Sequence, residues 1–480
     1  MDLEQAFMKN RALSLKTLSE VISIPSVQEN PAESPEGEKF PFGQDVQDVF
    51  MYMLSKGQEF GFETENADNY GGHIEFGHGK EIVGILGHLD VVPVQAEDWD
   101  FDPFSGEQKD GYILGRGTTD DKGPLLAAFF AMKILKDVGY VPDRRIRLIL
   151  GLDEETNWNG MDYYLKKIGA PDFGFTPDAD FPVIRAEKGI LHFDIVKKLS
   201  DRNEPGLDVR RMSAGTARNA VPGSSECVLL SENPEVYEEV RKTAEEVSEK
   251  RSAKVVLRRT GKSLKLMISG RTSHAAMPEK GTNSISVLFE ILGKLPLANA
   301  SLADFIRFYN ESIGYETDGK SIGCALSDSI SGDLTFCAGM LGYDRKSVTV
   351  SIDIRYPVTK SDDEVFSGMR PVLDQNGLGT VMVSHQAPIY QPDDSPLVDA
   401  LMKIYQEETG DAGSEPLVIG GGTYARACTN IVAFGGLFPG DPDIMHQANE
   451  KIEVRRYLEM IKIYVKAIRL LGSAEFKMEA

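Results

Sequence analysis

Apolar residues recur every three to four positions in the first part of the chain, a spacing that predicts amphipathic helices. One helix is expected before Pro25 and a second over 46–54. The pattern then changes to short, mostly apolar runs at 82–86 and 146–152, which predict buried strands. An apolar helix is expected between these runs, over 124–138. Strand, helix and strand in this order indicate a βαβ unit and a largely parallel sheet.

From Lys188 to about His385 the pattern is different, because apolar and polar residues alternate as in a sheet with one exposed face. The strands expected from this alternation include 190–196, 263–269 and 348–355, with helices near 234–250, 283–292 and 362–374. The segments after this stretch return to the first style, with apolar strands near 417–419 and 431–434 and a helix over 454–471. The middle stretch is therefore expected to be a second domain inserted into the first.

The expected fold is an α/β domain with a mostly parallel sheet and helices on both faces, formed by residues 1–187 and 386–480. An α+β domain is inserted at residues 188–385, and it is long enough to hold two subdomains. The length of 480 residues agrees with two domains, because a single hydrophobic core stops growing near about 250–300 residues.

Composition and charge narrow the possible partners and the compartment. The net charge of −22 repels phosphate backbones and anionic membranes, so no nucleic-acid or membrane partner is expected. The four cysteines are far apart and form no CxxC pair, which argues against a thiolate zinc site and fits a reducing compartment. The longest apolar run, 125–132, is far shorter than a membrane span, and no signal pattern is seen, so a cytoplasmic location is expected.

Three groups of polar residues stand at the ends of predicted elements. His88 and Asp90 follow the first buried strand, and the acidic triplet 153–155 follows the second. Between them, a glycine-rich loop at 115–119 delivers Asp120 and Asp121 to the start of a helix. In open α/β sheets, ligands gather at the carboxyl ends of strands. Taken singly, each group has a plainer explanation: a hydrogen-bonded histidine, a helix cap and a solvated turn.

Asp178 lies in a Thr-Pro-Asp segment that by itself reads as a turn, and His446 is a late histidine. Among the other histidines, His73 and His78 lie in a glycine-rich hairpin and are expected at the surface. Considered together, the carboxylates and histidines can hold two divalent ions with one aspartate between them. Such a pair polarises a carbonyl and generates hydroxide at neutral pH, and a nearby glutamate that binds no metal can act as general base.

At this point the sequence resembles the family of co-catalytic metallopeptidases that contains aminoacylases, carboxypeptidases and dipeptidases. It looks closest to the peptidase V, or carnosinase-like, dipeptidases. The match runs nearly from end to end, and four segments in this order carry it, together with His446: 87–93, 115–124, 153–155 and 273–278.

The resemblance implies a di-metal catalytic domain that hydrolyses the amide bond of dipeptides. Asp120 would bridge two divalent metal ions, with Glu154 as the general base that deprotonates the bridging water and Asp90 as the residue that orients His88. The remaining metal ligands would be His88 and Asp178 in one site, and Glu155 and His446 in the other. Zinc is the expected metal, and manganese or cobalt would also suit these ligands. The family has a cis peptide bond after the bridging aspartate, so the Asp120–Asp121 bond is expected to be cis.

The inserted domain would be the family's lid, and the resemblance of the sequence to this family implies further site residues there. His274 would stabilise the oxyanion, and Asn219 would lie near the substrate. Arg355 would pair with the substrate carboxylate in fork geometry, and the turn of Gly420, Gly421 and Gly422 could hold the same group by its N–H donors. A tight turn without a ligand is the alternative for these glycines.

The insert is about twice as long as in relatives that dimerise and borrow the lid histidine from a partner, so a self-sufficient monomer is expected. The enzymatic alternative is a deacylase of succinyl- or acetyl-amino acids, against which the long lid argues. A non-catalytic, metal-stabilised relative is the second alternative, disfavoured because Glu154 is retained. A two-metal phosphoesterase or nuclease is disfavoured by the acidic balance.

Overall fold

The computed structural model describes residues 1–35, 37–200, 205–233 and 235–478. The chain divides into two compact units. Unit 1 contains Met1–Ala186, Tyr390–Leu417 and Gly422–Ala480, and unit 2 contains Glu187–Ile389 and Val418–Gly421. The domain boundaries expected from the sequence, at 187 and 385, lie close to the two main division points.

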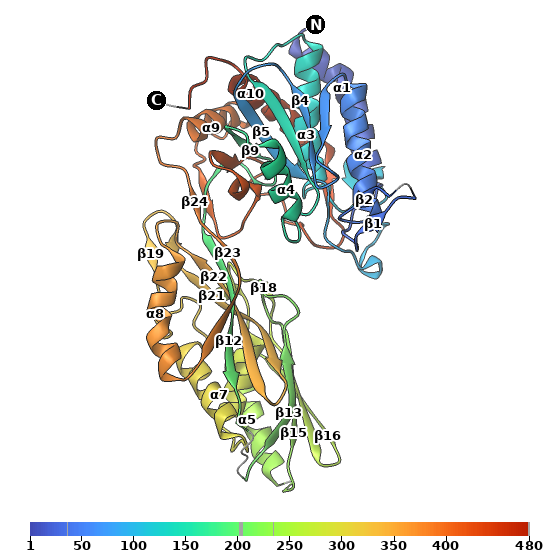
Figure 1. The fold of residues 1–480 in the computed structure, drawn as a ribbon. Coiled ribbons are helices and arrows are strands. Elements are labelled where there is room, and N and C mark those ends of the chain that lie inside the picture. The colour runs from blue at the N-terminus through green and yellow to red at the C-terminus, as the bar shows by residue number, and fades with distance from the viewer. Residues whose placement is uncertain (36, 201–204, 234, 479–480) are drawn as a thin grey trace. The chain divides into compact units, whose positions relative to one another are not determined.

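Unit 1 is built on a nine-stranded sheet whose central strands are parallel (Figure 1). The order is β24-β11-β26-β9-β5-β8-β4-β3, with β25 paired to β11. β26, β9, β5 and β8 run parallel. β11 pairs antiparallel with β26, β4 pairs antiparallel with β8, and β3 pairs antiparallel with β4. The strands are β3 (Glu63–Asn66), β4 (Gly72–Phe76), β5 (Ile82–His88), β8 (Arg145–Gly151), β9 (Phe173–Thr176), β11 (Ile184–Glu187), β24 (Ile389–Tyr390), β25 (Leu417–Ile419) and β26 (Ile431–Ala433).

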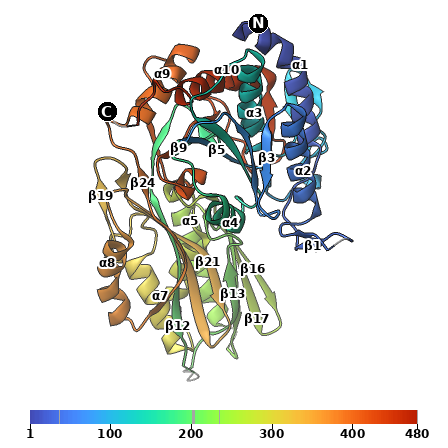
Figure 2. The ribbon, with the colours of Figure 1, turned by 45° about the horizontal axis from the view of Figure 1, so that its top comes forward.

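Helices cover both faces of this sheet, as β4 illustrates. Neighbouring residues of a strand point to opposite faces. Ile74 lies beside Gly57 of α2, whereas His73 on the other face contacts Tyr164 of α4. α3 packs against both α1 and α10 (Figure 2). The helices of unit 1 are α1 (Leu3–Ile22), α2 (Gln44–Glu59), α3 (Lys122–Asp137), α4 (Asn159–Ile168), α9 (Pro396–Thr409) and α10 (Val454–Leu471).

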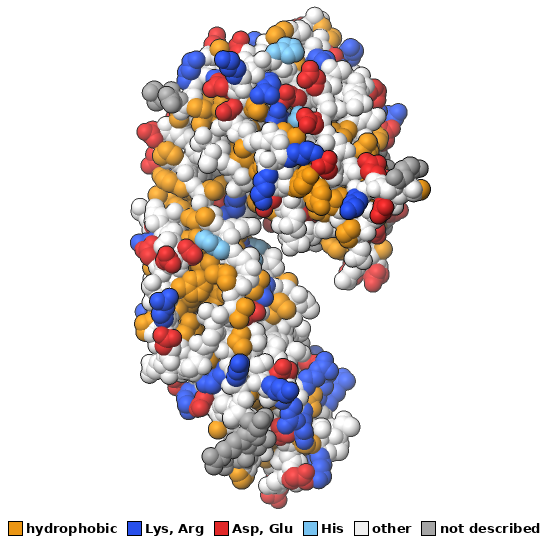
Figure 3. Space-filling model, viewed as in Figure 1, with side chains coloured by type: hydrophobic (Ala, Val, Ile, Leu, Met, Phe, Trp, Pro, Cys, Tyr) orange, Lys and Arg blue, Asp and Glu red, His pale blue; other side chains and the backbone are white. Residues whose placement is uncertain are grey.

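Short elements complete unit 1. Three of them form a small sheet of order β28-β7-β6, in which β7 directly precedes the loop that leads to Asp120. The short elements are β1 (Ala32–Glu33), β2 (Lys39–Phe40), η1 (Ala96–Asp98), β6 (Gln108–Lys109), β7 (Tyr112–Leu114), β10 (Ala179–Asp180), η3 (Tyr424–Ala427), β27 (Gly436–Leu437) and β28 (Lys451–Glu453). On the face shown in Figure 3, basic side chains of unit 1 are scattered among acidic ones.

Unit 2 has its own hydrophobic core and an antiparallel sheet of order β16-β17-β15-β13-β21-β22-β12-β23. The sheet strands are β12 (Gly189–Lys198), β13 (Asp208–Ala214), β15 (Ser224–Leu230), β16 (Lys254–Thr260), β17 (Ser263–Ser269), β21 (Thr335–Tyr343), β22 (Ser347–Tyr356) and β23 (Gly379–Gln386). The helices are α5 (Val236–Arg251), α6 (Ser284–Gly293), α7 (Ala300–Ser312) and α8 (Asp362–Gln375). The small elements are β14 (Ala220–Val221), β18 (Ser273–His274), η2 (Pro278–Lys280), β19 (Ser327–Asp328) and β20 (Gly332–Asp333).

The expected fold class, a mostly parallel α/β sheet with an inserted α+β domain, is confirmed. One expectation was wrong: His73 is not at the surface but in the interior strand β4, where it is buried. Helix α5 begins at Val236, and Pro234, where the helix was expected to begin, lies outside the described residues. Among the described residues, no helix has the length and apolar character that crossing a membrane requires.

Candidate metal centre

The polar groups singled out from the sequence meet at one edge of the unit 1 sheet. His88 is the last residue of β5, Asp153–Glu155 directly follow β8, and Asp178 comes just after β9. These three strands are parallel neighbours, so their carboxyl ends lie side by side. Asp120 reaches the same place from the loop before α3, and His446 from the loop before β28.

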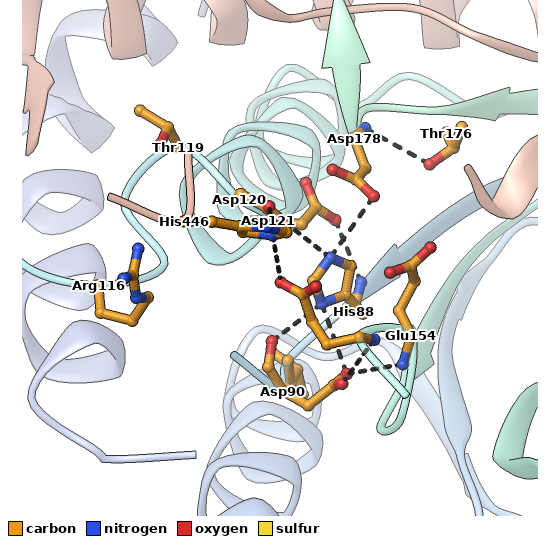
Figure 4. Close-up of polar contacts among 12 residues, drawn as sticks. His88, Asp90, Arg116, Thr119, Asp120, Asp121, Glu154, Thr176, Asp178 and His446 are labelled. Carbon is orange, nitrogen blue, oxygen red and sulfur yellow. Dashed lines mark hydrogen bonds and ion pairs between the residues drawn. The ribbon is translucent and has the colours of Figure 1, made fainter. Parts of the chain in front are cut away.

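The Asp120 carboxylate stands between two histidines (Figure 4). Its Oδ1 lies 3.1 Å from His88 Nε2, and its Oδ2 lies 2.9 Å from His446 Nε2. Each histidine has a second carboxylate beside it. Asp178 Oδ2 lies 3.5 Å from His88 Nε2, and Glu155 Oε1 lies 3.0 Å from His446 Nε2. The five side chains therefore form two histidine–carboxylate halves that share Asp120.

Asp90 is fully buried and holds His88 and the acidic turn after β8 in place. Its carbonyl oxygen lies 2.9 Å from His88 Nδ1, and its carboxylate Oδ1 lies 3.4 Å from the same nitrogen. The two carboxylate oxygens also accept the backbone N–H groups of Glu154 (3.2 Å) and Glu155 (3.1 Å). One aspartate thus orients the His88 ring and the start of the acidic turn after β8.

Glu154 differs from the other carboxylates of the site. Among the described residues, its carboxylate accepts no hydrogen bond from either histidine, although its atoms lie within 4.8 Å of ligand atoms of His88 and Asp178. Burial raises the pKa of Glu154 well above 4.5, and the charges of Asp178 and Glu155 raise it further. This side chain is therefore close to the cluster without belonging to either histidine pair.

The site holds more carboxylates than histidines, and most of its side chains are largely buried, whereas the His446 side chain is 54% exposed. Burial and the charge of Asp120 raise the pKa of Glu155 to about 7, and the same two causes raise the pKa of Asp178. Burial alone would lower the pKa of both histidines. Hydrogen bonds to carboxylates overcome it and raise the pKa of His446 to about 11 and that of His88 well above 6.5.

Divalent cations fit this donor set. Ligand atoms of His88, Asp120 and Glu155 lie within 4.8 Å of one another, as do those of His88, Glu154 and Asp178. Imidazole and carboxylate groups suit zinc, manganese and cobalt. A cation would take the place of the proton that each histidine holds and would offset the repulsion between the carboxylates.

The Asp120–Asp121 peptide bond is cis, as the resemblance implied. Asp121 Oδ2 accepts the backbone N–H of His88 at 3.1 Å, so this aspartate joins the α3 loop to the end of β5. A cavity of about 640 Å³ opens beside the cluster within unit 1. It is lined by Val27, Gln28, Glu29, Asn30, Asp90, Val91, Val92, Pro93, Glu155 and Thr156.

Unit 2 brings two of the predicted site residues together. His274 lies in β18, paired with Ala220 of β14, and Asn219 directly precedes β14. The Asn219 carbonyl accepts the N–H of Ala275 at 2.9 Å. The N–H of Ala276 donates to His274 Nδ1 at 3.1 Å, so the neutral ring carries its proton on Nε2.

Arg355 is held by Asp353 and Gly420, two residues that were not among its expected partners. Its Nε and Nη2 donate to the two carboxylate oxygens of Asp353, each at 2.7 Å, and its Nη1 donates to the Gly420 carbonyl at 2.8 Å. On the neighbouring strand β12, His192 places its Nε2 2.9 Å from the Asp353 carboxylate. Asp353 and Arg355 are two apart on β22 and so share a face, which is the one signal that could have paired them.

The glycine turn needs no positive φ at any of its three positions, because none of Gly420, Gly421 and Gly422 is among the residues with that conformation. Gly420 is nevertheless constrained, since an added Cβ would lie 3.0 Å from the Cβ of Ala276. Gly420 and Gly421 belong to unit 2, whereas Gly422 belongs to unit 1.

A parallel α/β sheet with histidines and carboxylates gathered at its carboxyl edge defines a candidate centre for metal-assisted hydrolysis. Residues 84–470 match the model of Peptidase family M20/M25/M40, and the chain belongs to this family. It is therefore a hydrolase of peptide bonds, and the resemblance seen in the motifs is confirmed.

The chain is 35% identical over 485 residues to the Beta-Ala-Xaa dipeptidase of Lactobacillus delbrueckii subsp. lactis, covering 99% of this chain and 100% of that protein. Human carnosine dipeptidase 1 has a similar structure, with a TM-score of 0.57, 16% identity and 98% of each chain covered. The aminoacylhistidine dipeptidase of Vibrio alginolyticus gives a TM-score of 0.56, 15% identity and 97% coverage of each chain. At these identities the two solved structures show likeness of fold alone.

Proposed function

We propose that this peptidase is a two-metal dipeptidase. The observation that carries the proposal is the arrangement around Asp120, whose two carboxylate oxygens each meet a different histidine. His88 and Asp178 would hold one cation, and Glu155 and His446 the other, with Asp120 between them. The 35% identity to a Beta-Ala-Xaa dipeptidase supports dipeptides as the substrate class.

Two bound cations, zinc with manganese or cobalt as alternatives, would polarise the scissile carbonyl and lower the pKa of the attacking water. Glu154 would accept the proton of that water and pass it to the leaving amine. Its support is the contrast with Glu155, which contacts His446 directly, whereas among the described residues the Glu154 carboxylate has no hydrogen bond or ion pair with either histidine. Its raised pKa has the direction that suits a base which must also release the proton.

Glu154→Ala and Glu155→Ala form a matched pair that tests this assignment. Glu154→Ala is expected to lose most turnover and keep two metals, and Glu155→Ala is expected to lose metal as well. Elemental analysis after gel filtration measures the metal content, and dipeptide hydrolysis measures turnover. Loss of a metal from Glu154→Ala would make Glu154 a ligand, a role that its nearness to His88 and Asp178 allows geometrically.

His274 of unit 2 would donate a hydrogen bond from Nε2 to the oxyanion of the tetrahedral intermediate. The hydrogen bond from Ala276 N–H to Nδ1 supports this role, because it selects the tautomer with the proton on Nε2. Asn219, which adjoins the same strand pair, would assist in holding the substrate. We infer that His274 acts within its own chain, so that the enzyme works as a monomer.

Arg355 would bind the substrate carboxylate with the part of its guanidinium that Asp353 leaves available. The side chain has five N–H donors, of which three are used by Asp353 and Gly420. One donor remains on Nη1 and one on Nη2, and these two would be available to a substrate carboxylate. The Gly420–Gly422 turn would add backbone N–H donors to the same carboxylate.

The substrate class is tested by comparing dipeptides, tripeptides, and acetyl- and succinyl-amino acids as substrates, each with zinc and with manganese. The proposal expects kcat/KM to be highest for dipeptides with free ends. Faster cleavage of the N-acyl amino acids would identify a deacylase, and faster cleavage of tripeptides would show that substrate length is not read.

A further inference from the structure

A buried carboxylate outside the cluster, Glu450, joins the two loops that deliver Asp120 and His446. Glu450 is 0% exposed. Its Oε1 accepts both the backbone N–H and the hydroxyl of Thr119, each at 2.8 Å. Its Oε2 accepts Nη1 of Arg116 at 2.5 Å, and its carbonyl accepts the N–H of Gly115 at 3.0 Å.

Further contacts attach the same segment to the first part of the chain. Strand β28 begins directly after Glu450 and pairs with β7, which ends directly before Gly115. Asn449 directly precedes Glu450. Its Oδ1 accepts the N–H of Asp100 at 2.8 Å, and its Nδ2 donates to the Asp100 carboxylate at 3.1 Å. The loop that carries His446 is therefore anchored on the loop that carries Asp120, and Glu450 is the buried charge at that junction.

We propose that Glu450 is a positioning residue for the metal pair, setting the placement of Asp120 relative to His446. Thr119, whose N–H and hydroxyl it accepts, directly precedes Asp120, and Glu450 follows His446 in the same loop. Figure 4 shows Arg116 and Thr119 on the loop that leads to Asp120. The inference rests on the proposed two-metal function and extends it to a residue that would bind neither metal nor substrate.

A carboxylate is needed at this position because its two oxygens serve different partners. Oε1 holds the Thr119 end of the loop, and Oε2 neutralises the buried guanidinium of Arg116, which is 3% exposed. A glutamine would still offer one acceptor, but its amide group would turn N–H donors toward Arg116 and leave that charge without its partner. Asp120 and His446 would then lose their fixed separation, and cation binding depends on that separation.

Glu450→Gln tests the proposal, with Glu75→Gln as a control for loss of stability. Glu75 also forms a buried pair in unit 1, its Oε2 accepting Nε of Arg147 at 2.7 Å, but it lies in β4. Metal affinity is titrated by competition with a chromophoric chelator, with zinc and with manganese, alongside the melting temperature. Both variants are expected to melt earlier. Only Glu450→Gln is expected to bind one of the two cations about ten-fold or more weakly.

Thr119→Ala and Thr119→Ser provide a second test that leaves the Arg116–Glu450 pair in place. Serine keeps the hydroxyl that donates to Glu450 Oε1, whereas alanine removes it. Weaker binding of one cation in Thr119→Ala, restored in Thr119→Ser, supports positioning even if Glu450→Gln does not fold. Unchanged affinity in Thr119→Ala and in any folded Glu450→Gln, or an equal loss in Glu75→Gln, would overturn it. If the unaltered enzyme does not bind two cations, the proposed function itself fails, which is a separate result.

Discussion

Replacing His73 with glutamine is expected to remove a pH dependence of stability that a surface histidine would not produce. His73 lies in β4 and is 5% exposed, with its Nδ1 2.9 Å from the Tyr164 hydroxyl. Burial, reinforced by the positive charges of Arg147 and Arg145, lowers its pKa to about 3. The folded protein therefore keeps this imidazole neutral at pH values where an unfolded chain would protonate it.

The sign follows from this difference. A histidine in the unfolded chain has a pKa of about 6.5, so below that pH the unfolded state binds a proton that the folded state does not bind. Stability is therefore lost as the pH falls, down to the folded pKa of about 3. The slope approaches about 1.4 kcal/mol per pH unit once the unfolded histidine is mostly protonated, so from about pH 8 to about 5 the loss assigned to His73 is about 2 kcal/mol.

Urea unfolding followed by tryptophan fluorescence measures this effect, because both tryptophans, Trp99 and Trp158, belong to unit 1. The free energy of unfolding of His73→Gln is subtracted from that of the unaltered protein at each pH, which cancels the titration of the metal centre. The difference should fall by about 2 kcal/mol over this range. His78→Gln, at an exposed position after the same strand, should run parallel to the unaltered protein. Parallel curves for His73→Gln would refute the reasoning.

Three further outcomes are expected. Removing metal with a chelator should lower the melting temperature, and zinc or manganese should restore it, because the carboxylates around Asp120 repel one another without cations; an unchanged melting curve after complete metal removal would contradict this. Mixing inactive Glu154→Ala with inactive His274→Ala should restore no activity if each site is formed within one chain, and recovered hydrolysis would show a shared dimeric site. Arg355→Ala should lower kcat/KM for free dipeptides by roughly 10²-fold or more and change little for dipeptide amides, which lack the carboxylate. Equal cleavage of acids and amides, with no effect of the mutation, would show that Arg355 does not bind the substrate carboxylate.

The sheet and much of the cluster could be predicted because they follow local rules. Apolar runs at 82–86 and 146–152 correspond to β5 and β8, and the polar residues after them meet because parallel strands end at one edge. Asp178 and His446 could not be linked to that edge by spacing alone. His446 lies far along the chain, and only resemblance to a family suggested a place for it.

His73 shows where local rules fail. The glycines at 71, 72, 77 and 79 suggested an exposed hairpin, but at Gly72 the reason for glycine is close packing. A Cβ there would lie 2.4 Å from the Glu65 carbonyl and 2.7 Å from the Phe50 ring. Glycine signals both a turn and a close approach of neighbours, and the sequence alone does not distinguish the two.

Arg355 shows a different limit, because its type and position were noticed but its surroundings were not. An arginine with nothing to hold it would have to lose side-chain freedom when a substrate binds, and that loss would weaken binding. Here Asp353 holds Nε and Nη2, and His192 and Arg355 contact the two Asp353 oxygens from adjacent strands. Burial alone would raise the pKa of Asp353, but Arg355 and His192 lower it to about 2, so the carboxylate stays charged and the pair stays formed at neutral pH. The guanidinium is thus oriented before any ligand arrives, as the proposed role of Arg355 in binding a substrate carboxylate would require.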